Sequence, residues 1–302
     1  MPTEPAAKTG ASPRAAWLVL VASAAFATAS PLSRLARPAH PIGVAFGRLA
    51  LAALVLFLLH PRRVVSAARR LGGRAWSRVA LAGGLLAGHF ALFQWGLDQT
   101  SLPAAASLIS LEPLAVVLTA WALFGIEPRR LEKVGVVVAT LGALLIARGA
   151  GEGEHQLFGD ALVLGAVALF GLYVASARAI KDAIEPLAYA PLVYAVAAAT
   201  LSFTLPFLAE RPGAVLWPLP ADSLAAIAAL GLIPTVVGHT LVQAGARTLS
   251  PSLVALVCPG ETLGSIAIAM VVWRKPPTIE EAIGGAVILG GAVIAIRAQR
   301  HD

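Results

Sequence analysis

The chain is poor in charge, because only 13% of its 302 residues are Asp, Glu, Lys or Arg. A soluble globular domain carries about 25% of such residues. Hydrophobic residues make up 58%, and the mean hydropathy is +0.80. The 28 glycines add small residues that let membrane helices approach closely. This composition excludes one large soluble core and predicts an all-helical bundle in a lipid bilayer.

The residues that most enzymes need are also scarce. The single cysteine, Cys258, lies within an apolar run, so no disulfide can form within the chain. We expect it to be a small buried hydrophobic residue. The sequence has neither a His-Glu-x-x-His pattern nor a Walker A lysine motif. A zinc protease and an ATPase therefore have no support. We expect no catalytic residues, no metal and no cofactor.

Acidic residues are outnumbered by basic ones, which gives a net charge of +7 and a pI of about 10.3. The basic residues lie in short segments between apolar runs rather than on one soluble face. Loops that face the cytoplasm carry such an excess of Lys and Arg. We therefore expect no nucleic-acid partner, and interpret the charge as a signal of membrane orientation.

The most informative pattern is an internal repeat: residues 94–148 and 243–297 are similar at a fixed offset of 149 positions, without a gap. Gln94 matches Gln243 at this offset, and Glu112 matches Glu261. A duplicated membrane unit is typical of transporters, in which two copies move against each other around a shared site. The repeat thus points to transport of a small molecule.

A helix needs about 20 apolar residues to cross a bilayer. Ten runs meet this need: 16–35, 41–60, 78–97, 102–124, 131–148, 159–180, 187–208, 222–244, 251–273 and 279–297. We divide the chain into a disordered tail (1–14), a first repeat (15–148), a linker (149–158), a second repeat (159–297) and a short tail (298–302). Residues 17–30 also resemble a signal peptide. An uncleaved first helix is favoured because the two copies then have comparable lengths.

Most of the 23 Lys and Arg fall on one side of the membrane when the N-terminus is placed in the cytoplasm. Both termini are therefore predicted to be cytoplasmic. Five helices per copy is an odd number, so the second copy enters the membrane inverted. We expect a central cavity between the halves, built by the third, fourth, eighth and ninth helices with contributions from the first and sixth.

Several local segments resemble a known family. Residues 96–114, then Gly125-Ile126-Glu127, then 135–147 resemble the end of an EamA domain of the drug/metabolite transporter superfamily, and Phe46-Gly47-Arg48-Leu49 resembles the start of its second helix. Residues 245–296 fit the same pattern, although Glu127 has no counterpart there. The resemblance implies a ten-helix exporter of small metabolites that works by alternating access in the bacterial inner membrane. Members of similar size and layout export amino acids.

Polar side chains at membrane depth are costly and are candidates for function. His89 and His239 lie midway along repeat-related helices. Either histidine can bind a carboxylate or relay a proton, or it can be a neutral side chain bonded to a neighbouring carbonyl. Gln243 shares a face with His239, and Phe93 shares one with His89, whereas Gln94 points away. We include all five in a substrate cavity, although core or lipid packing is the commoner role of an aromatic residue such as Phe93.

Three charged residues also lie within apolar runs. Glu112 and Glu261 are about ten residues into their helices, beside Pro113 and Pro259, where we expect local kinks. Each carboxylate can bind a substrate ammonium or a proton, or hold backbone donors that the kink frees. Arg48 can attract a carboxylate, snorkel to the headgroups or pair with an acid of an outer loop. These alternatives stay open at the level of sequence.

The predicted function is export of small zwitterionic metabolites, most simply neutral or aromatic amino acids, by a monomer with the lipid bilayer as its surroundings. Proton coupling through Glu or His stays open. Drug-like cations remain compatible with the two glutamates, whereas phosphorylated sugars and nucleotide sugars call for more than one deep cation. A membrane scaffold or sensor without transport would not need two glutamates and two histidines at depth.

Overall fold

A computed structural model describes residues 13–100, 105, 108–148, 157–208, 218–272, 274, 276 and 278–298. Residues 1–12, 149–156 and 299–302 are outside this description. Nearly all of the predicted tails and of the predicted linker therefore lie outside the described residues. Within the described part, the chain forms helices joined by short connections and contains no strand.

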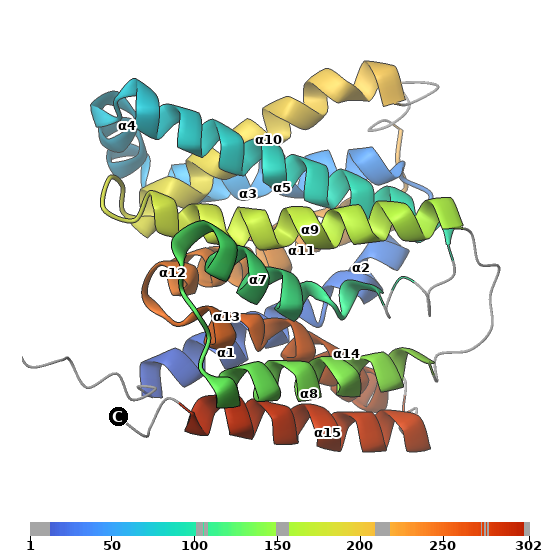
Figure 1. The fold of residues 1–302 in the computed structure, drawn as a ribbon. Coiled ribbons are helices and arrows are strands. Elements are labelled where there is room, and N and C mark those ends of the chain that lie inside the picture. The colour runs from blue at the N-terminus through green and yellow to red at the C-terminus, as the bar shows by residue number, and fades with distance from the viewer. Residues whose placement is uncertain are drawn as a thin grey trace, which may run out of the picture.

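The first half of the chain contains α1 (Pro13–Phe26), α2 (Ala29–Leu35), α3 (Pro41–Leu59), α4 (Pro61–Arg70), α5 (Gly73–Gln99), α7 (Glu112–Phe124) and α8 (Arg130–Arg148). The second half contains α9 (Leu157–Ala179), α10 (Pro186–Leu208), α11 (Ala221–Leu230), the π-helix η2 (Gly231–His239), α12 (Thr240–Thr248), α13 (Pro251–Ala255), α14 (Val257–Val272) and α15 (Ile279–Arg297). Figure 1 shows most of these helices running across the molecule in one common direction.

Six helical segments of the described chain are long and apolar enough to cross a membrane. They are Pro41–Leu59, Gly73–Gln99, Leu157–Ala179, Pro186–Thr204, Ala221–Thr248 and Pro251–Ile268. Shorter apolar helices cover Trp17–Ser33, Glu112–Phe124 and Ala282–Ala295. Each of the ten predicted runs contains helix. The protein is therefore a multi-pass, all-helical membrane protein.

The packing of the helices respects the sequence repeat. When each helix is replaced by its repeat partner, the same contacts recur. Helix α5 packs on α9 in the way that η2 and α12 pack on α1, and α7 packs on α9 in the way that α14 packs on α1. Two pairs, α8 with α15 and α3 with α10, join repeat partners directly. The two halves thus enclose a common centre (Figure 1).

The α8–α15 pair is held by glycines that the repeat places in register. A Cβ on Gly135 would lie 2.7 Å from the carbonyl oxygen of Gly291, and one on Gly142 would lie 2.7 Å from that of Gly284. Positions rise along α8 as they fall along α15, so the two helices are antiparallel. Since the backbones touch, only glycine fits at these four positions.

Several helices are interrupted near the centre. The chain turns at Ala27 and Thr28 between α1 and α2, at Ser110 and Leu111 before α7, and at Leu256 between α13 and α14. The last two breaks lie a few residues before the kinks predicted from the prolines. The π-helix η2 was not predicted, although Pro234 lies inside it. The segment from Pro61 to Arg74, expected only as a charged break, begins with the helix α4.

Candidate functional site: a buried polar centre between the repeats

Arg48 lies at the heart of the bundle, where only 2% of its surface is exposed. Its Nε donates a hydrogen bond to Oγ1 of Thr235, at 3.0 Å, and its Cζ lies 4.1 Å from the ring centroid of Phe90. It forms no salt bridge with any residue that the structure describes. At this depth Arg48 does not snorkel to the headgroups, which was one of the alternatives from the sequence, and it pairs with no outer-loop acid among the described residues.

Two histidines, one from each repeat, face each other beside this arginine. The ring centroids of His89 and His239 are 6.4 Å apart. His89 is fixed by a hydrogen bond of 2.9 Å between its Nδ1 and the carbonyl of Ala166. Aromatic rings surround His239, with centroid distances of 4.7 Å to Phe26 and 5.0 Å to Phe90. The two imidazoles thus lie in a buried aromatic cluster with little access to water.

This aromatic cluster contains buried polar atoms that form no hydrogen bond with the described residues. Nδ1 of His239, the hydroxyl of Tyr173 and both amide atoms of Gln243 are buried without a hydrogen-bond partner. The Tyr173 hydroxyl faces both Gln243 and Tyr194, but its geometry toward each of them does not meet that of a hydrogen bond. Buried polar groups without partners are costly. Four such atoms in one place are suited to a polar ligand that would complete their bonds.

The π-helix η2, within the eighth predicted run, supports this centre from one side. Pro234 has no N–H, so the carbonyl of Leu230 loses its ordinary helical donor. The hydroxyl of Thr235 donates to that carbonyl at 2.7 Å and in turn accepts from Arg48. The hydroxyl of Tyr194 donates to the backbone oxygen of Thr235, at 3.2 Å. The π-helix, which is often found at functional sites, thus links Arg48 to α10.

Two carboxylic acids lie on the other side of the centre. Glu112 is the first residue of α7 and is 5% exposed. Its carboxyl group faces the thiol of Cys258 and interacts electrostatically with Glu261. Glu261, on α14, is partly buried and is the carboxylate that acts electrostatically on Arg48. One cation and two carboxylates, from three helices, therefore share a low-dielectric region.

Two predicted site residues lie at the edge of this centre or outside it. Phe93 is half-buried and its ring is parallel to that of His89, with 6.2 Å between centroids. Gln94 is buried, but its Nε2 donates to the hydroxyl of Ser33 on α2, at 3.2 Å. The structure thus places Phe93 at the edge of the aromatic cluster and Gln94 at a contact between α5 and α2.

Sequence reasoning missed three residues that build the centre: Tyr173, Tyr194 and Thr235. All three are fully buried, and they come from α9, α10 and η2. The seventh predicted run and the second one, which carries Arg48, therefore contribute to a centre that we expected mainly from the third, fourth, eighth and ninth runs. The only signal was a tyrosine or threonine within an apolar run, which is common in any helix bundle.

The arrangement suits recognition rather than bond-breaking chemistry. Arg48 can bind an anionic group, and the two glutamates can bind a cationic one. The aromatic rings beside Arg48 and the histidines can hold an apolar side chain. Among the described residues, no cluster of three side chains could hold a metal ion.

Comparison with known proteins gives the chain its relatives. The model of the EamA-like transporter family matches it twice, over residues 13–148 and 157–297. A crystal structure whose description names no function is similar, with a TM-score of 0.80 and 20% identity over 95% of this chain and 98% of that chain. At that identity the likeness shows the fold alone. No curated protein sequence matches.

Proposed function

The chain belongs to the EamA-like transporter family, whose members are membrane transporters of small molecules, and we propose that this one exports zwitterionic metabolites. The cargo class is amino acids, neutral and aromatic ones first. On this proposal, the chain is similar in function to the amino-acid exporter YddG of the same superfamily. The transporter works without a cofactor, as a monomer in the inner membrane, with both termini in the cytoplasm.

One observation carries the choice of cargo. Arg48 is a buried cation without a salt bridge among the described residues, and it lies in a region shared with Glu112 and Glu261. An amino acid presents a carboxylate and an ammonium group to such a pair of charges. Its side chain would meet the rings of Phe90 and Phe93, and its polar atoms would complete the bonds of His239 and Gln243.

Alternating access is the mechanism that the repeat supports. Ten membrane helices arranged as two inverted five-helix repeats are consistent with the antiparallel α8 and α15 and with the exchangeable packing of the other helices. In such folds the substrate site lies at the interface of the repeats near the middle of the membrane. The two halves would rock about the α8–α15 seam and open the centre to each side in turn.

Drug-like cations are the second candidate, because carboxylates outnumber cations in the centre. This cargo would use Glu112 and Glu261 but would not need Arg48. An amino acid and its decarboxylated amine therefore separate the two proposals. Phenylalanine carries both charges, whereas phenethylamine carries only the positive one.

The test measures flux of labelled phenylalanine and phenethylamine into liposomes that contain the purified protein, with and without a pH gradient. We expect phenylalanine to be transported in preference to the amine. Arg48→Gln should reduce phenylalanine flux by about 10- to 100-fold, the value of a lost charge-assisted hydrogen bond. Dependence on the gradient would establish proton coupling, and its absence would indicate a uniporter.

The matched control is Arg130→Gln, which removes a charge from an exposed position on α8. It should transport at the wild-type rate. Thermal unfolding of each variant shows whether a loss of flux reflects misfolding. Transport of the amine alone, unchanged in Arg48→Gln, would favour the cationic cargo. A folded protein that moves neither compound, nor any member of a wider amino-acid panel, would refute the proposed cargo.

A further inference from the structure

We propose that α4 is a binding site for the headgroup of an anionic phospholipid in the leaflet where α1 begins and α15 ends. This inference concerns a surface outside the buried centre and does not depend on the cargo. Figure 1 places α4 at the left end of the molecule, between the end of α3 and the start of α5. Its position at the end of two membrane spans puts it at the level of the headgroups.

The sequence of α4 separates apolar from basic residues. Val64 is 4% exposed, and Ala67 packs against the core. Four arginines are exposed on the remaining surface: Arg62, Arg63, Arg69 and Arg70. A helix with one apolar face and a basic face lies along a membrane surface, with the basic side chains at the phosphates.

The helix is firmly attached to the bundle. It packs against α10 and α3. The indole nitrogen of Trp76 donates a hydrogen bond to the carbonyl of Ala68, at 3.1 Å, and the N–H of Leu71 bonds to the carbonyl of Ala67. The positive-inside rule depends only on the number of Lys and Arg residues in a loop. A segment that served only to orient the chain would therefore not need to form a helix packed against the bundle.

The four arginines have no acidic partner among the described residues. None of them forms a hydrogen bond or salt bridge with its side chain in the part of the chain that the structure describes. The sequence has no Asp or Glu anywhere between Pro5 and Leu97, so no neighbour along the chain neutralises them. An external anion is therefore the natural counter-charge.

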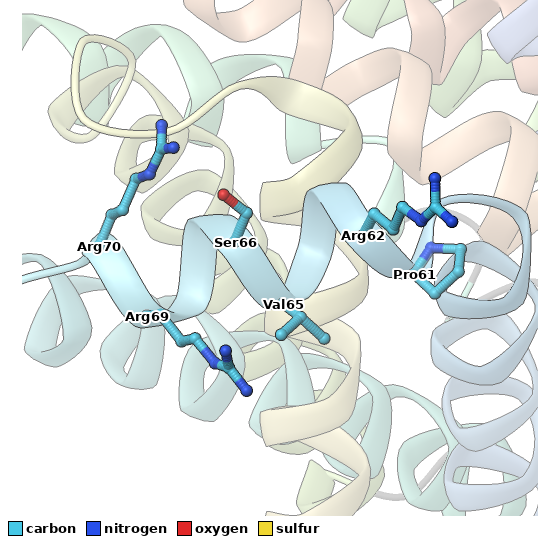
Figure 2. A pocket seen from close by; sticks show the side chains of 6 residues that line it. All are labelled: Pro61, Arg62, Val65, Ser66, Arg69 and Arg70. Atoms are coloured by element: carbon cyan, nitrogen blue, oxygen red, sulfur yellow. The ribbon is translucent and has the colours of Figure 1, made fainter.

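The exposed surface of α4 contains a shallow pocket lined by groups that can bind a phosphate. A shallow pocket of about 510 Å³ is lined by Pro61, Arg62, Val65, Ser66, Arg69 and Arg70. Figure 2 shows Arg62, Ser66 and Arg70 on one side of the helix and Val65 with Arg69 on the other. Guanidinium groups bind phosphate oxygens in pairs, and a hydroxyl can add a further donor.

Apolar neighbours favour a lipid over a free phosphate or a nucleic acid. At the end of α3, directly before α4, Leu58 and Leu59 are 64% and 63% exposed. Val65, within the pocket, is 38% exposed. In the proposed placement Leu58 and Leu59 would face the hydrocarbon of the membrane, so a lipid whose headgroup lies on α4 could place its acyl chains beside them.

The experiment uses the purified full chain, stripped of lipid in detergent and then mixed with equal amounts of phosphatidylglycerol and phosphatidylcholine. Native mass spectrometry measures the occupancy of each lipid. We expect wild type to retain phosphatidylglycerol preferentially. A triple variant, Arg62→Gln with Arg69→Gln and Arg70→Gln, should lower that occupancy by at least about tenfold, because each arginine contributes to the attraction. The three Arg→Lys changes should preserve most of it.

The matched control removes three charges from the same end of the molecule but from α8 and α15, which lie away from α4 (Figure 1): Arg130→Gln, Lys133→Gln and Arg297→Gln. It should bind phosphatidylglycerol within about twofold of wild type. Equal loss in the control would reduce the site to general charge and overturn the proposal. So would unchanged binding in the α4 variant, equal binding of the two lipids, or tighter binding of glycerol 3-phosphate or of an RNA oligonucleotide than of the lipid. Thermal unfolding midpoints verify that each variant is folded.

Discussion

The hydroxyl groups of two buried tyrosines in the centre differ in their hydrogen bonding. The hydroxyl of Tyr194 is within hydrogen-bond distance of the backbone oxygen of Thr235 and of Oγ1 of Thr240, at 3.2 and 3.0 Å. The hydroxyl of Tyr173 is buried without any partner. A hydroxyl with internal partners contributes to folding, whereas one without them costs folding energy unless a ligand binds it.

We therefore expect Tyr194→Phe and Tyr173→Phe to behave differently. Tyr194→Phe should lower the free energy of unfolding by about 1–2 kcal/mol, since it breaks hydrogen bonds and leaves a buried acceptor unpaired. Tyr173→Phe should leave stability unchanged or slightly raised, yet weaken transport by several-fold. Thermal unfolding and liposome flux measure the two effects. If Tyr173→Phe destabilised the protein and kept full flux, its hydroxyl would belong to the fold rather than to the cargo.

The pairing of α8 with α15 illustrates how neighbouring glycines can have different roles. A Cβ on Gly291 would lie 2.5 Å from the backbone nitrogen of Ala139 and 2.6 Å from the carbonyl oxygen of Gly135. A Cβ on the adjacent Gly290 would meet nothing within 4 Å. The first glycine permits contact between helices, whereas the second faces away from α8.

Gly291→Ala should therefore destabilise the protein by about 1–3 kcal/mol, the typical cost of overpacking. Gly290→Ala should be neutral or stabilising by up to about 1 kcal/mol, because alanine favours a helix more than glycine does. The midpoints of thermal unfolding in one detergent compare the two variants directly. Equal midpoints would mean that the α8–α15 contact is looser than the backbone distances indicate.

Helices were predictable here because a membrane span has a strong and simple signal. Each of the ten apolar runs contains helix, and the fixed offset placed Gly142 and Gly291 as equivalents before their helices were seen to touch. The breaks were harder. Pro113 and Pro259 indicated openings that the chain makes a few residues earlier, at Leu111 and Leu256. Pro234 gave the same kind of signal for η2, but tolerated prolines inside membrane helices are too common to predict a π-helix.

The centre was only partly predictable, because depth along a helix does not reveal which helices are neighbours. Arg48, His89 and His239 were found as costly polar residues at depth, and the structure brings them together. Gln94 had the same depth but bonds to Ser33 on another contact. Tyr194 was missed because its importance comes from the position of α10 beside η2, which no periodicity records.

Repeat-related contacts lie at both ends of the molecule. At the end where α2 and α5 finish, Arg37 bonds to Asp98 at 2.8 Å, and Thr100 bonds to Asp160 at 2.8 Å. At the opposite end, Arg247 donates to the backbone oxygens of Lys181 and Ile184. Asp98 and Arg247 are equivalent at the repeat offset. The Arg37 and Arg247 contacts each join segments of one repeat at its own end of the molecule, so we expect the loss of either contact to loosen that end.

The single cysteine makes that motion measurable without further engineering. Cys258 is 7% exposed and lies beside Glu112 in the closed centre, so a membrane-impermeant maleimide should label it slowly in wild type. Arg247→Gln should raise the labelling rate several-fold from the side of α4, and Asp98→Asn should raise it from the opposite side. Sealed vesicles of the two orientations separate the sides. We expect this result because each substitution removes a contact at one end only and leaves the contacts at the other end in place. Faster labelling from both sides in either variant would indicate local unfolding, and no change in either would mean that these contacts do not control access to the centre.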